Sequence, residues 1–307
     1  MNHDNKQANR VALVTGAARR IGACIATHLH QAGFRVVVHC HRSQTAAKKL
    51  VSEMNTRRHD SALMLVADLS IKQEAIDLIT NSIAWASRLD LLVNNASMFT
   101  TTRMDVLDDS EWENLFTTNV QAPFWLSHSA YPHLALHNGS IINITDIHAQ
   151  KPLKNYSIYC QSKAALAMQT LSLAREFAPS VRVNAVAPGA TMWPEQTNAL
   201  SEDIQQQIIE RTPLKRHGDP VFIAQAVLAL AENPFITGQT LSVDGGQGVG
   251  LGGEEAARRL GHPRPLLLGR GLAVVARPAA VVAVVVAVGV RVVLDLRPAA
   301  GETGAVV

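Results

Sequence analysis

The sequence predicts a doubly wound α/β domain, in which helices cover both faces of one parallel β-sheet. From Val11 onward, short apolar runs rich in β-branched residues alternate with longer amphipathic stretches, which is the pattern of a parallel sheet with crossover helices. The runs VALV at 11–14 and IINI at 141–144 are apolar at nearly every position, as strands buried on both faces must be. Together these features indicate a single Rossmann-like domain.

The elements follow one another in a regular alternation along the chain. Each β-rich apolar run is assigned as a strand, and each amphipathic stretch as a helix. The predicted strands span 11–15, 35–40, 62–66, 90–94, 139–145, 181–187 and 239–243. The predicted helices span 21–32, 45–58, 72–87, 111–131, 156–177, 202–211 and 219–232.

The charge distribution argues against nucleic-acid and membrane partners. The chain has 307 residues and a formal charge of +3. Residues 251–307 contain seven Arg and four acidic residues, so the rest of the chain carries 21 basic and 21 acidic residues. A balanced main domain has no electrostatic footprint for DNA or for an anionic membrane surface. We therefore expect neither nucleic acid nor a membrane as partner.

Composition divides the chain into three segments. Residues 1–10 are a polar N-terminal extension without the apolar core of a secretory signal. Residues 11–250 form the predicted domain. Residues 251–307 contain no Lys, Ser, Asn, Gln, Ile, Phe, Tyr, Met, Cys or Trp, and their apolar run 279–290 is too short to span a bilayer. We expect this tail to be non-native or poorly ordered, as a frameshift or readthrough would produce, with a partner-binding tail as the alternative.

The cysteines indicate a reducing compartment. Cys24, Cys40 and Cys160 are odd in number, far apart and without metal-ligand spacing. We therefore expect a cytoplasmic protein with no metal site.

A candidate cofactor turn follows the first predicted strand. Thr15-Gly16-Ala17-Ala18-Arg19-Arg20-Ile21-Gly22 leads from the strand into a helix, whose free amides can face a pyrophosphate. Small residues are needed there because the phosphate must approach the backbone closely. The turn departs from the G-x-G-x-x-G template, so a plain strand-to-helix turn remains the alternative.

The end of the second strand favours NADPH over NADH. An NAD-dependent enzyme usually places an acid here to bind the ribose hydroxyls, but this chain has His41, Arg42 and Ser43. These residues can bind a 2′-phosphate by charge-assisted hydrogen bonds; a solvated basic loop is the alternative. Asp68, after the third strand, is placed to contact adenine or to cap a helix.

The candidate catalytic residues are Tyr159, Lys163 and Asp146. The spacing of Tyr159 and Lys163 places both side chains on one helix face, where an ammonium group would lower the phenol pKa and support a proton donor. Asp146 ends the fifth predicted strand, at the ligand-binding edge of the sheet. For Tyr159 and Lys163 the alternative is a surface helical pair, and for Asp146 it is a structural cap.

These motifs together resemble the short-chain dehydrogenase/reductase family over residues 10 to about 250. The motifs, in family order, are Thr15-Gly16-x-x-x-x-x-Gly22, Asn94-Asn95-Ala96, Asn119, Tyr159-x-x-x-Lys163 and Pro188-Gly189. The resemblance implies that Tyr159 donates a proton, that Lys163 binds ribose and supports the phenol, and that Asn119 holds a water in the proton relay. It implies a cofactor site formed by Gly16, Arg19, Arg20, Ile21, Gly22, His41, Arg42, Ser43, Asp68, Asn95, Ala96, Ser97, Tyr159, Lys163, Pro188 and Gly189.

At some positions where the sequence departs from the general family pattern, it resembles the pteridine reductases. Arg20 stands at the usual middle glycine and Asp146 at the usual serine. The subgroup resemblance extends to Asn55-x-Arg57-Arg58, His39-x-His41-Arg42-Ser43 and Asn95-Ala96-Ser97-Met98-Phe99. It implies that NADPH reduces a C=N bond of a pterin or folate, giving dihydro or tetrahydro products, with Tyr159 and Asp146 protonating the adjacent nitrogen. The implied substrate residues are Arg20, Ser97, Phe99, Asp146 and Tyr159.

Trp193, in the loop 188–195 after the sixth strand, is a further candidate substrate residue; anchoring the loop to the next helix is its alternative. Without the resemblance, Phe99 would be an ordinary loop or core aromatic.

Two rival functions remain at this point: a short-chain carbonyl reductase acting on a 3-oxoacyl thioester or ketone, and a non-catalytic NADPH-binding sensor. Asp146 and Arg20 argue against the first, and the intact Tyr159–Lys163 pair argues against the second. The resemblance implies a homotetramer, with residues 219–232 and 239–243 as interface candidates.

Overall fold

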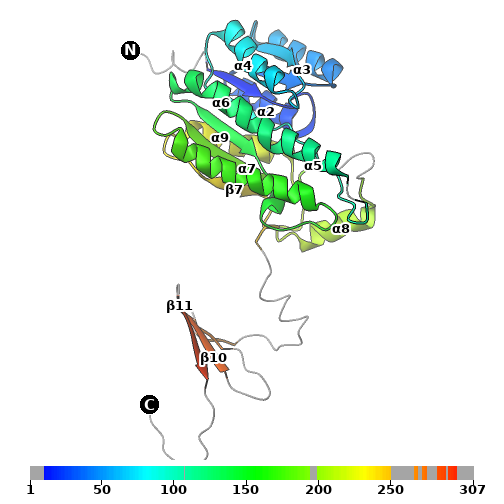
Figure 1. Cartoon of the computed structure of the whole chain (residues 1–307), viewed down its shortest axis with the longest axis vertical. Coiled ribbons are helices and arrows are strands. Elements are labelled where there is room, and N and C mark those ends of the chain that lie inside the picture. Colours follow the sequence, from blue (N-terminus) through cyan, green and yellow to red (C-terminus); the bar gives the residue numbers. More distant parts are fainter. Residues whose placement is uncertain are drawn as a thin grey trace, which may run out of the picture. The chain divides into compact units, whose positions relative to one another are not determined.

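The computed structural model describes residues 10–106, 108–193 and 199–249, together with short strands between Leu266 and Asp295. The chain divides into two compact units, one ending at Gly248 and the other beginning at Val249 (Figure 1). In the second unit, β8 (Leu266–Leu268) pairs antiparallel with β9 (Leu272–Val274), and β10 (Val282–Ala287) pairs antiparallel with β11 (Val290–Asp295). The non-native origin expected for residues 251–307 stays a prediction. Of the expected extension 1–10, only Arg10 is among the described residues.

The first unit is built on one seven-stranded sheet in the order β3-β2-β1-β4-β5-β6-β7. Every neighbouring pair in this sheet is parallel. The strands are β1 (Val11–Val14), β2 (Arg35–Cys40), β3 (Ala62–Val66), β4 (Leu91–Asn94), β5 (Ser140–Ile144), β6 (Arg182–Pro188) and β7 (Thr240–Val243). The predicted doubly wound, Rossmann-like fold is therefore confirmed.

Helices cover both faces of the sheet. Helices α2 (Arg20–Gln31), α3 (Gln44–Arg57) and α9 (Pro220–Glu232) pack on one face. The opposite face carries α4 (Lys72–Ala86), α6 (Ala122–Ala135) and α7 (Ser157–Glu176). Helices α5 (Asp109–Phe116) and α8 (Glu202–Arg211) complete the described helices of more than one turn, apart from a π-helical segment described below. No helix among the described residues is long and apolar enough to cross a bilayer.

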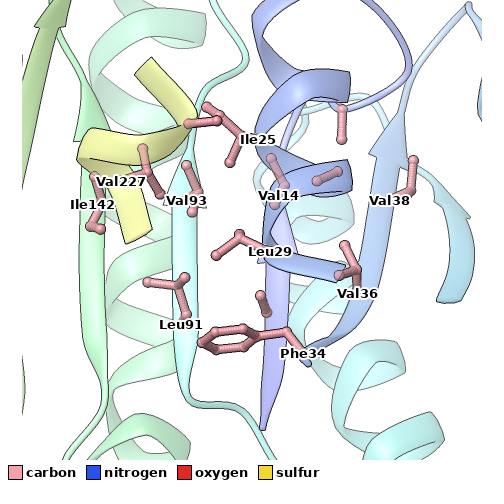
Figure 2. Close-up of a cluster of buried hydrophobic side chains, with 14 of the residues drawn as sticks. Val14, Ile25, Leu29, Phe34, Val36, Val38, Leu91, Val93, Ile142 and Val227 are labelled. Carbon is pink, nitrogen blue, oxygen red and sulfur yellow. The ribbon is translucent and has the colours of Figure 1, made fainter. Parts of the chain in front are cut away.

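The apolar strands supply two cores because their side chains alternate between the faces. In β1, Ala12 and Val14 belong to one buried cluster, and Val11 and Leu13 belong to the other. Figure 2 shows the first cluster, in which apolar side chains of α2 lie over the central strands. Each fully buried Val, Leu, Ile or Phe side chain contributes about 1.5–3 kcal/mol of transfer free energy. This double burial explains why the strand sequences are apolar throughout.

The predicted helix 111–131 differs from the structure. It is divided into α5, a π-helical segment Thr117–Gln121 and α6. The Asp108 side chain caps α5 by accepting a hydrogen bond from the Ser110 amide. A π-helical turn closes its hydrogen bonds over five residues instead of four, and such single turns within α-helices often lie at functional sites. The segment places Asn119 on the inner side of the helix, where it is fully buried.

The strand order creates a crevice at one edge of the sheet. The chain runs from β1 outward to β2 and β3, then returns to pair β4 with the other side of β1. Ligands of open α/β sheets bind beside the carboxyl ends of the strands at this reversal. The Thr15–Gly16 turn and the Asn94–Ala96 segment meet there.

Candidate active site and cofactor cleft

The turn after β1 is held against the segment after β4. The Thr15 hydroxyl accepts hydrogen bonds from the Asn95 and Ala96 amides, at 2.9 and 3.0 Å. Gly16 adopts a positive φ of 61°, and a Cβ at this position would lie 3.0 Å from the Ala96 Cα. A Cβ on Gly22 would lie only 2.3 Å from the Gly16 carbonyl oxygen. The two glycines therefore allow the turn and helix α2 to pack closely, as a phosphate-binding turn requires.

A cleft of about 740 Å³ opens beside this turn. The structure brings together twelve of the predicted cofactor residues around it: Gly16, Arg19, Arg20, Ile21, Gly22, His41, Arg42, Ser43, Asp68, Asn95, Ala96 and Ser97. It also adds residues to which the sequence assigned no cofactor role, namely Ala18, His39, Cys40, Leu69, Ser70, Met98, Asn114 and Thr118. Tyr159, Lys163, Pro188 and Gly189 are not among its lining residues.

The N-terminus of α2 points at this cleft with its first amides available. Its N-cap residue is Arg19, no side chain among the described residues caps the helix, and its first turn holds no acid. Such a terminus carries a partial positive charge and favours a bound anion. Arg20 has a positive φ of 55°, and its guanidinium donates to the Trp193 carbonyl oxygen at 2.9 Å. This contact ties the helix terminus to the loop after β6.

The basic residues at the end of β2 lie at the outer part of the cleft. His41 and Arg42 are exposed, and Ser43 is half-buried. His41 Nε2 lies 3.6 Å from Asp68 Oδ2. The same carboxylate accepts from the Ser70 amide and hydroxyl, and these hydrogen bonds hold the Asp68 pKa below its usual value. Asp68 thus stabilises its own turn; the alternative that it caps the next helix is wrong, because Ile71 is the N-cap of α4.

Tyr159 and Asp146 form the closest pair among the candidate catalytic residues. The Tyr159 hydroxyl donates to Asp146 Oδ2 at 2.7 Å. The other carboxylate oxygen, Oδ1, accepts from the His148 amide at 2.8 Å and so caps the short 3-10 turn Ile147–Ala149. Asp146 therefore combines the cap considered from the sequence with a direct bond to the phenol. This pairing joins the end of β5 to the first turns of α7.

The effect expected of Lys163 on Tyr159 is not what the structure shows. Lys163 Nζ donates to the Ile144 carbonyl oxygen at 3.0 Å and lies 5.8 Å from the centre of the Tyr159 ring. Burial lowers the pKa of Lys163 to about 8. The pKa of Tyr159 is instead raised well above 10, by burial first and then by the charge of Asp146. The expectation of a lowered phenol pKa is wrong here because burial and the adjacent carboxylate both raise it.

Asn119 holds the segment after β4 against α7. Its Oδ1 accepts from the Ser97 hydroxyl at 3.0 Å and from the Met98 amide at 2.8 Å. Its Nδ2 donates to the Met98 carbonyl and to the Ser162 hydroxyl, both at 3.0 Å. The side-chain amide is thus committed to protein partners, and the role of Asn119 in holding a relay water stays a prediction.

Two further aromatic rings, those of Phe99 and Tyr156, pack beside Tyr159. Phe99 stacks on Tyr156 with ring centres 4.4 Å apart and meets Tyr159 edge-on at 4.7 Å. Tyr156 was not predicted, although its position three residues before Tyr159 places it at the start of the same helix. Trp193 packs against His217 at 4.4 Å, which fits the anchoring alternative considered for it. Pro194 and Glu195 of the predicted loop lie outside the described residues.

Pro188 and Gly189 end β6 beside the strand β7. The Gly189 amide donates to the Val243 carbonyl at 3.1 Å, and a Cβ on Gly189 would lie 2.7 Å from the Asp244 Cβ. This glycine is needed for close packing against the turn after β7. Among the described residues, no group of three or more His, Cys, Asp or Glu side chains could hold a metal ion.

Comparison with known proteins assigns the chain to a family. Residues 16–247 match the family model described as enoyl-(acyl carrier protein) reductase. A 3-oxoacyl-[acyl-carrier-protein] reductase of Staphylococcus epidermidis is 35% identical over 242 residues, covering 78% of this chain and 98% of the relative. A putative ketoacyl reductase of granaticin polyketide synthase, from Streptomyces violaceoruber, is 36% identical over 245 residues, covering 77% of this chain and 95% of the relative.

A short-chain dehydrogenase/reductase of Pestalotiopsis microspora is 34% identical over 252 residues, which is 77% of this chain and 94% of the relative. The expected family is confirmed, and with it an oxidoreductase that uses a nicotinamide cofactor. The pteridine reductase subgroup is a finer assignment that these relatives do not carry. The chain belongs to the short-chain dehydrogenase/reductase family.

Proposed function

We propose that this enzyme is an NADPH-dependent pteridine reductase. The observation that carries the proposal is the 2.7 Å hydrogen bond from the Tyr159 hydroxyl to Asp146. A carboxylate beside the phenol can take a proton from solvent and pass it to the phenol oxygen, and it can accept hydrogen bonds from the N–H groups of a pterin. Beside a carbonyl substrate, the same carboxylate would add negative charge next to the developing oxyanion, where a hydroxyl group would serve better.

The described residues fit a nicotinamide cofactor with a 2′-phosphate. The uncapped N-terminus of α2 and the tightly packed glycine turn suit a pyrophosphate. Arg42 and His41 border the same cleft at the end of β2, where Arg42 would pair with the 2′-phosphate. Bound NADPH would supply the hydride that reduces the substrate.

Protein residues would carry out the proton transfer and hold the substrate. The buried Tyr159 hydroxyl, kept protonated by its raised pKa, donates a proton to the ring nitrogen next to the carbon that is reduced. Asp146 then passes a proton from solvent to the phenol oxygen, restoring the starting state. Phe99, held by its stack on Tyr156, offers an aromatic wall for a planar pterin ring. Ser97 and Arg20 are the further substrate contacts in this proposal.

A second candidate is a carbonyl reductase acting on a 3-oxoacyl thioester. The named relatives favour it, because a 3-oxoacyl-[acyl-carrier-protein] reductase and a putative ketoacyl reductase are each more than one third identical to this chain. These relatives support the second candidate more directly than the first. The case for a pterin rests on Asp146 and the aromatic wall at the site.

The two candidates are separated by turnover. NADPH oxidation is followed at the wavelength of its nicotinamide absorbance with dihydrobiopterin, dihydrofolate and an acetoacetyl thioester in parallel, using wild type, Tyr159→Phe and Asp146→Ser. Turnover of a pterin or folate that both substitutions reduce supports the proposal. Turnover of the thioester alone, retained or increased in Asp146→Ser, overturns it and favours the carbonyl reductase.

We further propose a cytoplasmic homotetramer that uses α9 and β7 at its interfaces. Strand β7 is the last strand of the sheet, and Leu241 on it is 43% exposed; an exposed strand edge is a common pairing surface. Cys24, Cys40 and Cys160 are all free, which suits a reducing compartment. Light scattering of wild type and Leu241→Lys tests the assembly: a tetramer dissociated by the charge supports it, and a wild-type monomer overturns it.

A further inference from the structure

His39 links three segments that border the cofactor cleft. Its Nδ1 accepts a hydrogen bond from the Gly16 amide at 3.0 Å, and its Nε2 bonds to the Ala67 carbonyl oxygen at 3.1 Å. Its own carbonyl accepts from the Ala17 amide at 2.8 Å. One residue at the end of β2 thus contacts the turn after β1 and the segment after β3.

The hydrogen-bond partners fix the protonation state of this ring. The Gly16 amide can only donate, so Nδ1 must be unprotonated, and the Ala67 carbonyl can only accept, so Nε2 must carry the proton. His39 is 2% exposed, and burial lowers its pKa to about 4. His39 is therefore a neutral imidazole of one tautomer at neutral pH, with both nitrogens satisfied.

The linked segments would each bind a different part of the cofactor. Gly16 begins the turn that faces the pyrophosphate, Arg42 lies three residues after His39, and Asp68 directly follows Ala67. Gly16, His39, Arg42 and Asp68 border the same cleft. A side chain that fixes their relative positions reduces the conformational freedom that cofactor binding would otherwise remove.

We propose that His39 is a positioning residue for the nicotinamide cofactor, which holds the glycine turn and the adenosine-binding segments at the spacing that NADPH requires. The inference rests on the proposed use of this cleft for NADPH, but not on the identity of the reduced substrate. Its two hydrogen bonds have separable roles. The bond to Gly16 acts on the pyrophosphate turn, and the bond to Ala67 acts on the adenosine side.

Substitutions can remove these bonds one at a time. His39→Asn places an oxygen near the position of Nδ1, which can still accept from Gly16, but it has no donor that reaches Ala67. His39→Gln places an N–H group near the position of Nε2, which can still reach Ala67, but it leaves the Gly16 amide without its acceptor. His39→Phe keeps the ring volume and removes both bonds.

The control is a second buried histidine outside the cleft. His30 on α2 is 4% exposed, and its Nε2 lies 2.7 Å from the Ser61 hydroxyl. His30→Phe removes a comparable buried hydrogen bond without contacting any of the linked segments. It therefore measures how far a general loss of stability alone affects cofactor binding.

The experiment measures the Kd for NADPH by nicotinamide fluorescence, the KM and kcat for NADPH, and the Tm of each variant. We expect His39→Phe to raise the Kd about tenfold, equivalent to about 1.4 kcal/mol, with most of the loss in kcat/KM appearing in KM. We expect His39→Asn to lie closer to wild type than His39→Gln, because the glycine turn bears the pyrophosphate. His30→Phe should lower the Tm but leave the Kd within twofold of wild type.

Equal Kd values for wild type and the His39 variants would overturn the inference, as would a rise matched by His30→Phe. If His39→Phe does not fold, the His39→Asn and His39→Gln variants provide the test. Kd values for NADPH that equal the wild-type value in both variants would overturn the inference. The Kd for NADPH is measured in the absence of a pterin. The test therefore remains valid even if the pterin assignment fails. Absence of NADPH binding by wild type would overturn the inference together with the cofactor assignment.

Discussion

The Tyr159 hydroxyl donates to Asp146 at 2.7 Å, whereas the Lys163 ammonium lies 5.8 Å from the centre of the same ring. The carboxylate is therefore the first partner of the phenol, and the lysine is held separately by the Ile144 carbonyl. This order of contacts keeps Tyr159 protonated, since both burial and the negative charge raise its pKa. A protonated phenol is the form that a proton donor requires.

Tyr159→Phe should abolish most of the turnover while preserving the ring packing against Phe99. Positioned proton donors contribute about 10²- to 10⁴-fold in rate, so we expect a fall of that size in kcat, with a much smaller change in the Kd for NADPH. Steady-state kinetics and fluorescence titration measure the two effects. Tyr131→Phe is the matched control, because Tyr131 stacks on Phe177 away from the cleft. A kcat within threefold of wild type in Tyr159→Phe would contradict the assigned role.

NADPH binding should weaken as the pH rises through about 8. Lys163 is charged below its pKa of about 8 and neutral above it, so an alkaline solution removes the charge that would support the cofactor ribose. The charge of Asp146 raises this pKa, and Asp146→Asn should therefore move the change in Kd to lower pH. Fluorescence titrations between pH 6 and pH 10 measure both curves. Superimposable curves for wild type and Asp146→Asn would show that Lys163 does not control the transition.

Arg42→Ala should reduce the preference for NADPH over NADH. A hydrogen bond to a charged group contributes about 1.5–3 kcal/mol, so kcat/KM for NADPH should fall roughly 10- to 100-fold, while kcat/KM for NADH changes little. The ratio of the two values is the measurement. Arg57→Ala, which removes an exposed arginine at the end of α3, should leave this ratio unchanged. An equal loss with both cofactors would place the 2′-phosphate elsewhere.

Gly22→Ala should damage the cofactor cleft as well as the fold. The added Cβ would lie 2.3 Å from the Gly16 carbonyl oxygen and 2.5 Å from Asn95 Nδ2, so helix α2 must move away from the turn. Overpacking of this kind costs about 1–3 kcal/mol. Gly33→Ala is the control, since its φ of 96° makes the substitution unfavourable but its Cβ would meet nothing within 4 Å. Both variants should have a lower Tm, and only Gly22→Ala should raise the Kd for NADPH.

The free energy of unfolding should fall as the pH drops from about 6.5 to 4. In this range the unfolded chain protonates His39 while the native protein does not, since burial lowers the pKa of this histidine to about 4. Each pH unit contributes up to about 1.4 kcal/mol, so His39 accounts for roughly 3 kcal/mol over the range. Urea unfolding at several pH values should give a shallower slope for His39→Asn than for wild type. Parallel slopes would show that His39 is protonated in the native state.

Local sequence patterns determined the elements of this fold. Strands at 35–40 and 62–66 and the helix at 202–211 were predicted with the bounds that the structure shows, because apolar runs and helical periodicity are properties of neighbouring residues. The same holds for the glycine turn after β1, since strand, turn and helix are contiguous there. The helix predicted at 111–131 was less accurate, because one continuous amphipathic stretch does not show where α-helical bonding changes to a π-helical turn.

Contacts between distant residues were decided by the tertiary structure. The sequence placed Tyr159 and Lys163 one helical turn apart and predicted that the lysine would set the phenol pKa, yet Asp146, thirteen residues away, is the nearer partner. His39 stands in the motif His39-x-His41-Arg42-Ser43 but received no role from the sequence, because its partners Gly16 and Ala67 lie on two other strand ends. Periodicity specifies which face a side chain occupies, but strand order and burial specify which groups meet and which charge form is stable. The sequence by itself therefore determined the fold class and the family, and the three-dimensional packing determined the chemistry of the site.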